Sequence, residues 1–183
     1  MKRMKLLLLS TLFLSVLSCG QTSNKSPKIE IQSGWKNLDE NGYSIQYPEN
    51  WELNKSGQMG TSFMILSALS SQQDNFRENV NLIIQDLSGQ NINLDKYVEL
   101  SENQVKTMIV NGEILESKRQ NINGVNFHKI IFTGKQGIYN LKIEQYYFIE
   151  KGKAFILTLT CEISEFEKYK ETGEKILNSF KIK

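Results

Sequence analysis

Apolar and polar positions follow different patterns along this chain of 183 residues. Residues 61–69 and 80–87 are rich in large apolar side chains at both alternating positions, a pattern typical of strands that are covered on both faces. From Glu113 to Cys161 the pattern has a period of two and is broken by short glycine-containing joints, which force neighbouring strands to be antiparallel. The sequence therefore predicts a four-stranded meander over residues 113–122, 125–133, 140–150 and 153–161.

A helical pattern replaces the strand pattern between residues 94 and 109, where apolar side chains recur at intervals of three and four. Asn93 is placed to act as the N-cap of this helix by accepting a hydrogen bond from its first turn. We expect the helix to stop at Asn111-Gly112, because glycine readily takes the left-handed conformation that follows a helix end.

A second helix is predicted close to the C-terminus. Residues 164–167 read Ser-Glu-Phe-Glu, the pattern of a capping box in which the serine and the second glutamate accept hydrogen bonds from each other's amides. An apolar stripe follows and ends at Phe180. Gly173 lies within this stripe, and we expect it to weaken the helix by ~1 kcal/mol relative to alanine.

A small hairpin is predicted near residue 40. Its strands are residues 35–38 and 43–47, and Asn41-Gly42 between them favours a tight turn. Pro48 lacks a backbone donor and ends the second strand.

The first nineteen residues have the layout of an export signal. A basic start leads into the apolar run Leu6–Leu17, which is too short to span a bilayer, and a small residue then precedes Cys19. This order resembles a bacterial lipoprotein signal, in which residues 1–18 are removed and Cys19 is acylated. Residues 19–33 then form a polar, flexible spacer, and residues 34–183 form one domain. Gly20, in place of an aspartate, slightly favours the outer membrane.

Charge and cysteine content exclude several classes of protein. Three of the 22 basic residues lie in the signal, which leaves 19 against 20 acidic residues with no basic block, so we expect no binding to nucleic acid. If Cys19 carries lipid, Cys161 has no partner for a disulfide bond. Its position on the apolar face of a strand predicts a buried thiol.

Catalytic and metal-binding patterns are missing from the sequence. His128 is the only histidine, and it shares a strand face with Ile130 and Phe132, which favours a packed side chain. No CxxC, HExxH or Gly-x-Ser-x-Gly motif occurs. The acidic pairs lack the spacing of a calcium loop and lie where loops or helix starts are expected; they are Asp39/Glu40, Asp74/Glu78 and Glu165/Glu167. We therefore expect no enzyme activity, no metal and no cofactor.

Aromatic side chains are the remaining candidates for a binding site. They pack in cores and are also enriched at interfaces and pockets, so both interpretations stay open, with core packing favoured. The candidates are Tyr43, Tyr47, Trp51, Tyr146 and Phe148.

Residues 42–51, GYSIQYPENW, resemble the opening of PsbP-like domains, where a glycine and an aromatic residue start a strand that ends in aromatic-Pro-x-x-Trp. The order of elements that follows is similar too, so the resemblance covers about Trp35 to Ile182. It implies an α+β fold in which one antiparallel β-sheet has α-helices packed on both faces, as in DcrB-like bacterial lipoproteins. Members of this family mostly bind proteins, and we match no ion ligands of the family to positions in this chain.

The expected function is a non-catalytic, lipid-anchored binding or assembly module of the bacterial cell envelope. It would be attached to a membrane through its N-terminal lipid and would recognise an unidentified envelope protein. The alternative is a carrier that holds an apolar small molecule or lipid between the sheet and a helix. Fold alone decides neither.

Overall fold

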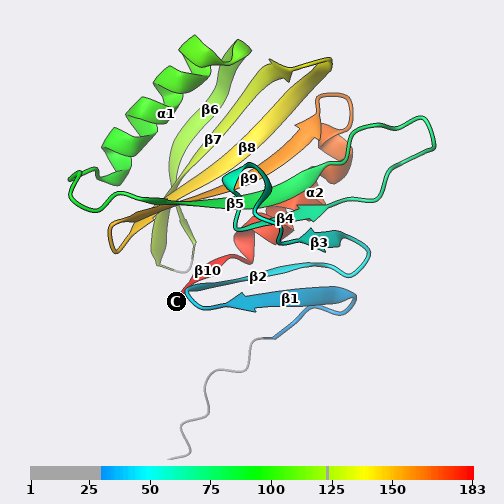
Figure 1. Cartoon of the computed structure of the whole chain (residues 1–183), viewed down its shortest axis with the longest axis horizontal. Helices are drawn as coiled ribbons and strands as arrows, with labels where there is room; N and C mark the ends of the chain where they lie inside the picture. The colour runs from blue at the N-terminus through cyan, green and yellow to red at the C-terminus, as the bar shows by residue number, and fades with distance from the viewer. Residues whose placement is uncertain (1–29, 123) are drawn as a thin grey trace, which may run out of the picture. The chain divides into compact units, whose positions relative to one another are not determined.

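A computed structural model describes residues 30–122 and 124–183 of the chain (Figure 1). The predicted signal at residues 1–18, the predicted acylation site Cys19 and most of the expected spacer at residues 19–33 lie outside these described residues. Within the described part, no helix has the length and apolar character needed to cross a membrane.

The larger of two sheets has seven strands, and every neighbouring pair is antiparallel. The predicted meander forms its second half and is confirmed, with two-residue turns such as Lys151-Gly152 between strands. In spatial order the strands are β3 (Glu52–Asn54), β4 (Phe63–Leu66), β5 (Asn79–Asp86), β9 (Lys153–Glu162), β8 (Tyr139–Glu150), β7 (Val125–Gln136) and β6 (Val110–Ile122).

The smaller sheet contains the predicted hairpin, β1 (Trp35–Glu40) and β2 (Tyr43–Pro48), closed by Asn41-Gly42. A third strand, β10 (Lys181–Ile182), pairs with the other side of β2. We expected one sheet, and the structure has two. The short strands β3 and β10 and a 3-10 turn, η1 (Gln58–Gly60), were not predicted, because two or three residues carry no measurable period.

The first helix, α1 (Leu94–Met108), begins as predicted, since the side chain of Asn93 accepts a hydrogen bond of 2.9 Å from the amide of Lys96. The predicted stop at Asn111-Gly112 is wrong, because both residues lie inside β6. Gly112 is needed for a different reason. A Cβ atom at this position would lie 2.1 Å from the carbonyl oxygen of Val105, so the strand passes close to the last turn of the helix.

The second helix, α2 (Phe166–Asn178), begins without the predicted capping box. Glu165 is its N-cap residue and makes no side-chain capping bond; its carboxylate pairs with Lys168 at 2.7 Å instead. Gly173 is buried, and a Cβ atom there would lie 2.5 Å from a methyl carbon of Leu159. The prediction that this glycine is only a weak point is therefore wrong, because it lets the helix approach the sheet.

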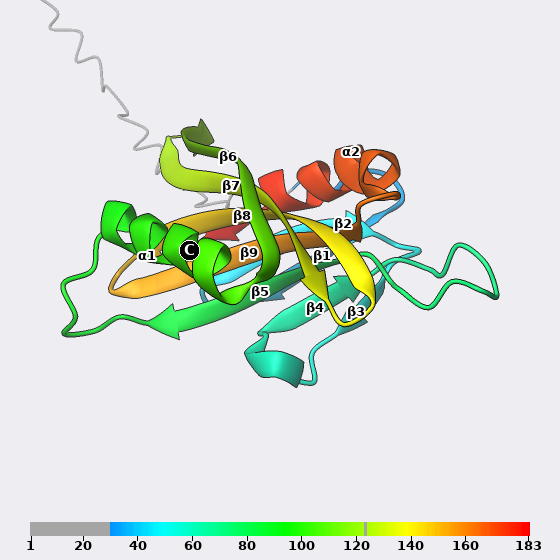
Figure 2. The same ribbon diagram turned by 90° about the horizontal axis from the view of Figure 1, so that it is seen from above.

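The helices cover opposite faces of the seven-stranded sheet, as the view in Figure 2 shows. One core lies under α1 and includes Val98, Ile130 and Tyr147. The other core lies under α2 and the smaller sheet, and includes Ile45, Leu157 and Leu177. The predicted α+β class, with helices on both faces of an antiparallel sheet, is confirmed.

Candidate functional site

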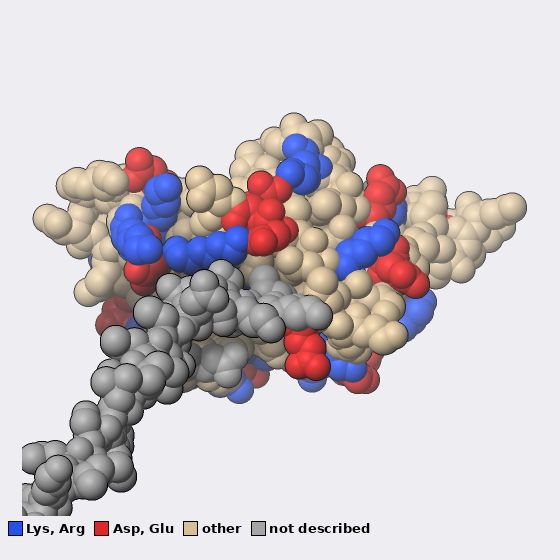
Figure 3. All heavy atoms as spheres, turned by 90° about the horizontal axis from the view of Figure 1, so that it is seen from below, with Lys and Arg blue, Asp and Glu red and all other residues tan. Residues whose placement is uncertain are grey.

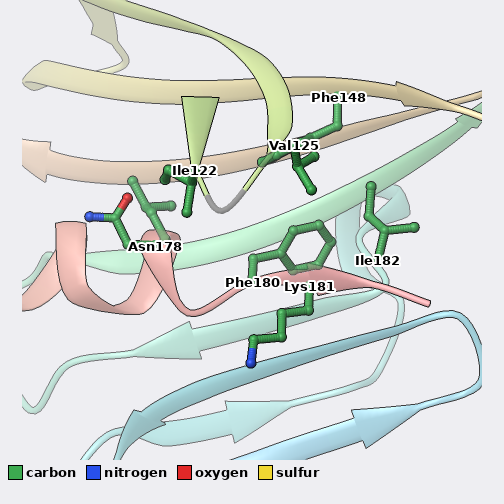
Figure 4. Close-up of a pocket in the computed structure, with 8 residues that line it drawn as sticks. Ile122, Val125, Phe148, Asn178, Phe180, Lys181 and Ile182 are labelled. Carbon is green, nitrogen blue, oxygen red and sulfur yellow. The ribbon is translucent and has the colours of Figure 1, made fainter. Parts of the chain in front are cut away.

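An apolar pocket of about 460 Å³ opens at one end of the α2 face. Residues from three regions of the chain meet there: the adjoining ends of β6 and β7, Phe148 of β8, and the segment 177–182, which runs from the end of α2 into β10. Figure 4 shows Ile122 and Val125 of the β6–β7 hairpin opposite Phe180 and Ile182.

Aromatic packing fixes the floor of the pocket. The ring of Phe180 lies 5.6 Å from the ring of Phe148 and 5.9 Å from that of Tyr43, between centroids. Phe148 in turn stacks on Phe127 at 5.2 Å. Such aromatic pairs each contribute about 0.5–1.5 kcal/mol beyond the free energy of burying their surface. The floor of the pocket is therefore preformed.

The rim of the pocket is more exposed than its aromatic floor and includes a charged residue. Val125 is 49% exposed, and Ile122 and Ile182 are half-buried. Lys181 is exposed, and among the described residues its ammonium group has no ion pair or hydrogen bond. The pocket thus offers an apolar cavity with a free positive charge beside it.

The five aromatic residues suggested by the sequence are all buried. Tyr43 and Tyr47 face the core from β2, and Trp51 packs against the ring of Tyr169 at 6.0 Å. Tyr146 lies in the core as well, where burial raises the pKa of its hydroxyl. Only Phe148 also lines the pocket.

Most of the pocket was missed by sequence reasoning, because its residues come from separate regions of the chain. Ile122 and Val125 are single apolar residues on either side of a two-residue turn. Apolar residues at the end of a hairpin are unusual unless they pack against another part of the molecule, and this was the available signal for the pocket. Phe180 and Ile182 were assigned only to the end of a helical stripe or to no element.

A histidine, a serine and a glutamate meet on the α1 side of the sheet. The Oγ atom of Ser117 lies 2.7 Å from Nε2 of His128 and 2.5 Å from a carboxylate oxygen of Glu102. A hydroxyl has one hydrogen to donate. Donated to Glu102, it leaves His128 as the donor to Ser117, so the imidazole does not activate the serine as a base would. This arrangement joins α1 to β6 and β7 and does not form a nucleophilic site.

The half-buried position of His128 agrees with this role. Burial and the nearby charge of Arg119 lower the pKa of the imidazole, which keeps it neutral near pH 7. Its Nδ1 atom is buried without a hydrogen-bond partner.

A buried charged pair lies on the other face of the sheet, the face that α2 covers. The ammonium of Lys129 is 2.9 Å from a carboxylate oxygen of Glu144, whose side chain is fully buried, and 3.4 Å from Glu174 on α2. Burial opposes the charge on Lys129, but the hydrogen bond and charge of Glu144 outweigh it and raise the pKa of the ammonium. Burial raises the pKa of Glu144. Through Glu174 the pair connects α2 with the sheet, and none of the three residues lines the pocket.

Metal and thiol chemistry find little support in the described part of the chain. No group of three His, Cys, Asp or Glu side chains there could hold a metal ion. Cys161 is fully buried, and burial raises the pKa of its thiol. Positive and negative side chains are intermixed on the face visible in Figure 3.

Comparison with known proteins assigns the fold to a family. The family model described as PsbP matches residues 34–182. The chain belongs to the PsbP family. Among curated proteins, no sequence matches this chain.

Solved structures of low sequence identity share the PsbP fold with this chain. Cyanobacterial PsbP (CyanoP) from Synechocystis sp. PCC 6803 is 14% identical with a TM-score of 0.62, over 88% of this chain and 99% of that one. LpqN of Mycobacterium tuberculosis, described as involved in cell envelope biogenesis, is 13% identical with a TM-score of 0.60, over 81% and 91%. PA94 from Pseudomonas aeruginosa, described as a putative regulator, is 12% identical with a TM-score of 0.55, over 79% and 94%.

Proposed function

We propose that this PsbP-family protein is a non-catalytic binding module of the bacterial cell envelope that recognises a protein partner. The observation that carries the proposal is the open apolar pocket of about 460 Å³ between the β6–β7 hairpin and β10. The lipoprotein-like signal in the sequence and the envelope role stated for LpqN support the location.

The shape of the pocket favours a protein partner over a carried small molecule. A site that carries a ligand usually buries 70–90% of the ligand's surface. This pocket is open and has half-exposed side chains on its rim, so it suits one inserted side chain of a larger partner. Large buried side chains are the residues that supply most of the binding energy at protein interfaces.

Site-specific crosslinking in the native envelope tests this function. A photo-crosslinking amino acid replaces Val125 at the pocket rim, and in a control chain it replaces Met59, which is 68% exposed on η1 outside the pocket. We expect a discrete protein adduct from position 125 that is missing from position 59. Equal adducts from both positions, or none from position 125, would contradict the proposal.

The volume of the pocket supports a second candidate, a carrier of an apolar small molecule or lipid. At about 460 Å³ the pocket lies within the size range of ligand sites. Native mass spectrometry of protein extracted from its own envelope separates the two functions. A stoichiometric apolar ligand that is lost on Val125→Asp substitution would favour the carrier.

A further inference from the structure

Strand β10 is an open edge beside the pocket. The order β1-β2-β10 leaves no strand on its second side, and Figure 4 shows β10 between the β6–β7 hairpin and the strands of the smaller sheet. An unpaired strand edge presents backbone donors and acceptors to which another extended chain can bind.

The register shows which backbone groups are free. Lys181 pairs with Ser44, and the amide of Lys183 donates to the carbonyl of Gly42 at 3.0 Å. In an antiparallel ladder, alternate residues turn their amide and carbonyl toward opposite neighbours. The amide and carbonyl of Ile182 therefore point away from β2, toward the pocket.

The side chains of β10 alternate in the same way. Phe180 and Ile182 lie on the core side and line the pocket, whereas Lys181 points away from the β6–β7 hairpin (Figure 4). A chain that paired with β10 would place one side chain on the side of Ile182 and the next on the side of Lys181.

We propose that β10 pairs with an extended segment of the partner protein, in which a large apolar residue opposite Ile182 fills the pocket and an adjacent acidic residue lies beside Lys181. This inference rests on the proposed binding function. Strand addition of this kind draws affinity from backbone hydrogen bonds and specificity from pockets for alternate side chains. An apolar small molecule would use the pocket but leave the backbone of Ile182 unpaired.

Defined peptides bound to the full-length chain in lipid nanodiscs test the inference. The probe is the acetylated and amidated peptide Thr-Glu-Phe-Glu-Thr. One variant replaces its phenylalanine with serine, and another methylates the backbone nitrogen of the phenylalanine. We expect each change to weaken binding at least about tenfold, which corresponds to about 1.4 kcal/mol. Dodecanoate serves as the apolar ligand that lacks a peptide backbone.

Protein variants and hydrogen exchange complete the test. Val125→Ser should lower the affinity of the protein for the parent peptide at least about tenfold, whereas Met59→Ser should leave this affinity unchanged. Exchange at the amide of Ile182 should be fast in the free protein and slow with the peptide, and the amide of Lys181, already paired with Ser44, should change little.

The outcomes separate the two proposals. If binding depends on Val125 but tolerates N-methylation and leaves the amide of Ile182 exchanging fast, the strand-pairing inference is overturned while the pocket keeps its binding role. Protection of the Ile182 amide by dodecanoate alone would also overturn it. If neither peptide nor dodecanoate binding depends on Val125, the pocket has no binding role and both proposals fail.

Discussion

Gly173 shows how a single missing side chain sets the distance between α2 and the sheet. A Cβ atom there would lie 2.5 and 2.8 Å from the two methyl carbons of Leu159, which is itself fully buried. We expect Gly173→Ala to lower the free energy of unfolding by about 1–3 kcal/mol, because overpacking outweighs the gain in helix propensity. Urea denaturation measures this. Glu171→Ala, on the exposed side of α2, should stay within about 0.5 kcal/mol of the parent, and a stabilised Gly173→Ala chain would contradict the packing.

His128 gives the fold a dependence on pH. Burial lowers the pKa of the folded imidazole, so between about pH 7 and 5 the unfolded chain binds more protons than the folded one. The free energy of unfolding should therefore fall as the pH drops through about 6.5, by at most about 1.4 kcal/mol per pH unit. Because no other histidine exists, the difference between the parent and His128→Gln isolates this effect. Parallel curves for the two proteins over this range would disprove it.

At the scale of elements, the cap of α1 is the feature that sequence and structure agree on most directly. The side chain of Asn93 accepts from the amide of Lys96, and Asp95 adds a negative charge at the positive end of the helix dipole. We expect Asn93→Ala to cost about 1 kcal/mol in thermal or urea unfolding. Gln90→Ala, in the exposed loop before the helix, is the matched control. If Asn93→Ala lowers the free energy of unfolding no more than Gln90→Ala does, Asn93 does not cap the helix.

Helices and strands with a long periodic pattern of apolar residues could be predicted from the sequence. Features that depend on two distant backbone segments lying close together could not. The period-two meander and the start of α1 follow from local patterns, as does the turn at Asn41-Gly42. Gly112 was taken for a helix stop because the sequence cannot show that the carbonyl of Val105 lies against it. The predicted capping box failed because α2 begins one residue later than the box requires, with Glu165 and not Ser164 at the N-cap position.

The pocket could not be predicted because it belongs to no single element. It forms only when β10, two residues long, pairs with β2 and turns its free edge toward the β6–β7 hairpin. The aromatic residues singled out by the sequence instead hold this arrangement together from inside. Among those five residues Phe148 alone also lines the pocket, as Leu177 and Phe180 of the same core do.

At the scale of the whole molecule, the fold persists where identity with solved structures is only 12–14%. A binding function at an open edge and a shallow pocket is compatible with this, because it needs few residues. If the proposed binding function holds, the rim of the pocket, at positions such as Val125 and Lys181, would decide what the chain binds.

The membrane anchor is the last prediction, and it concerns how the whole domain is held. If Cys19 is acylated, the twelve residue-to-residue steps between Cys19 and Ile31 reach up to roughly 40 Å, enough to hold the domain clear of the bilayer. Each buried methylene of a fatty chain adds ~0.8 kcal/mol to membrane binding. We expect an alkyne analogue of palmitate to label the parent chain and Cys161→Ser, but not Cys19→Ser, and the processed domain of Cys19→Ser to leave the envelope fraction. Labelling that survives Cys19→Ser would place the acyl group on another residue. An unlabelled Cys19→Ser domain that fractionates with the envelope as before would mean that contacts other than this lipid hold it there.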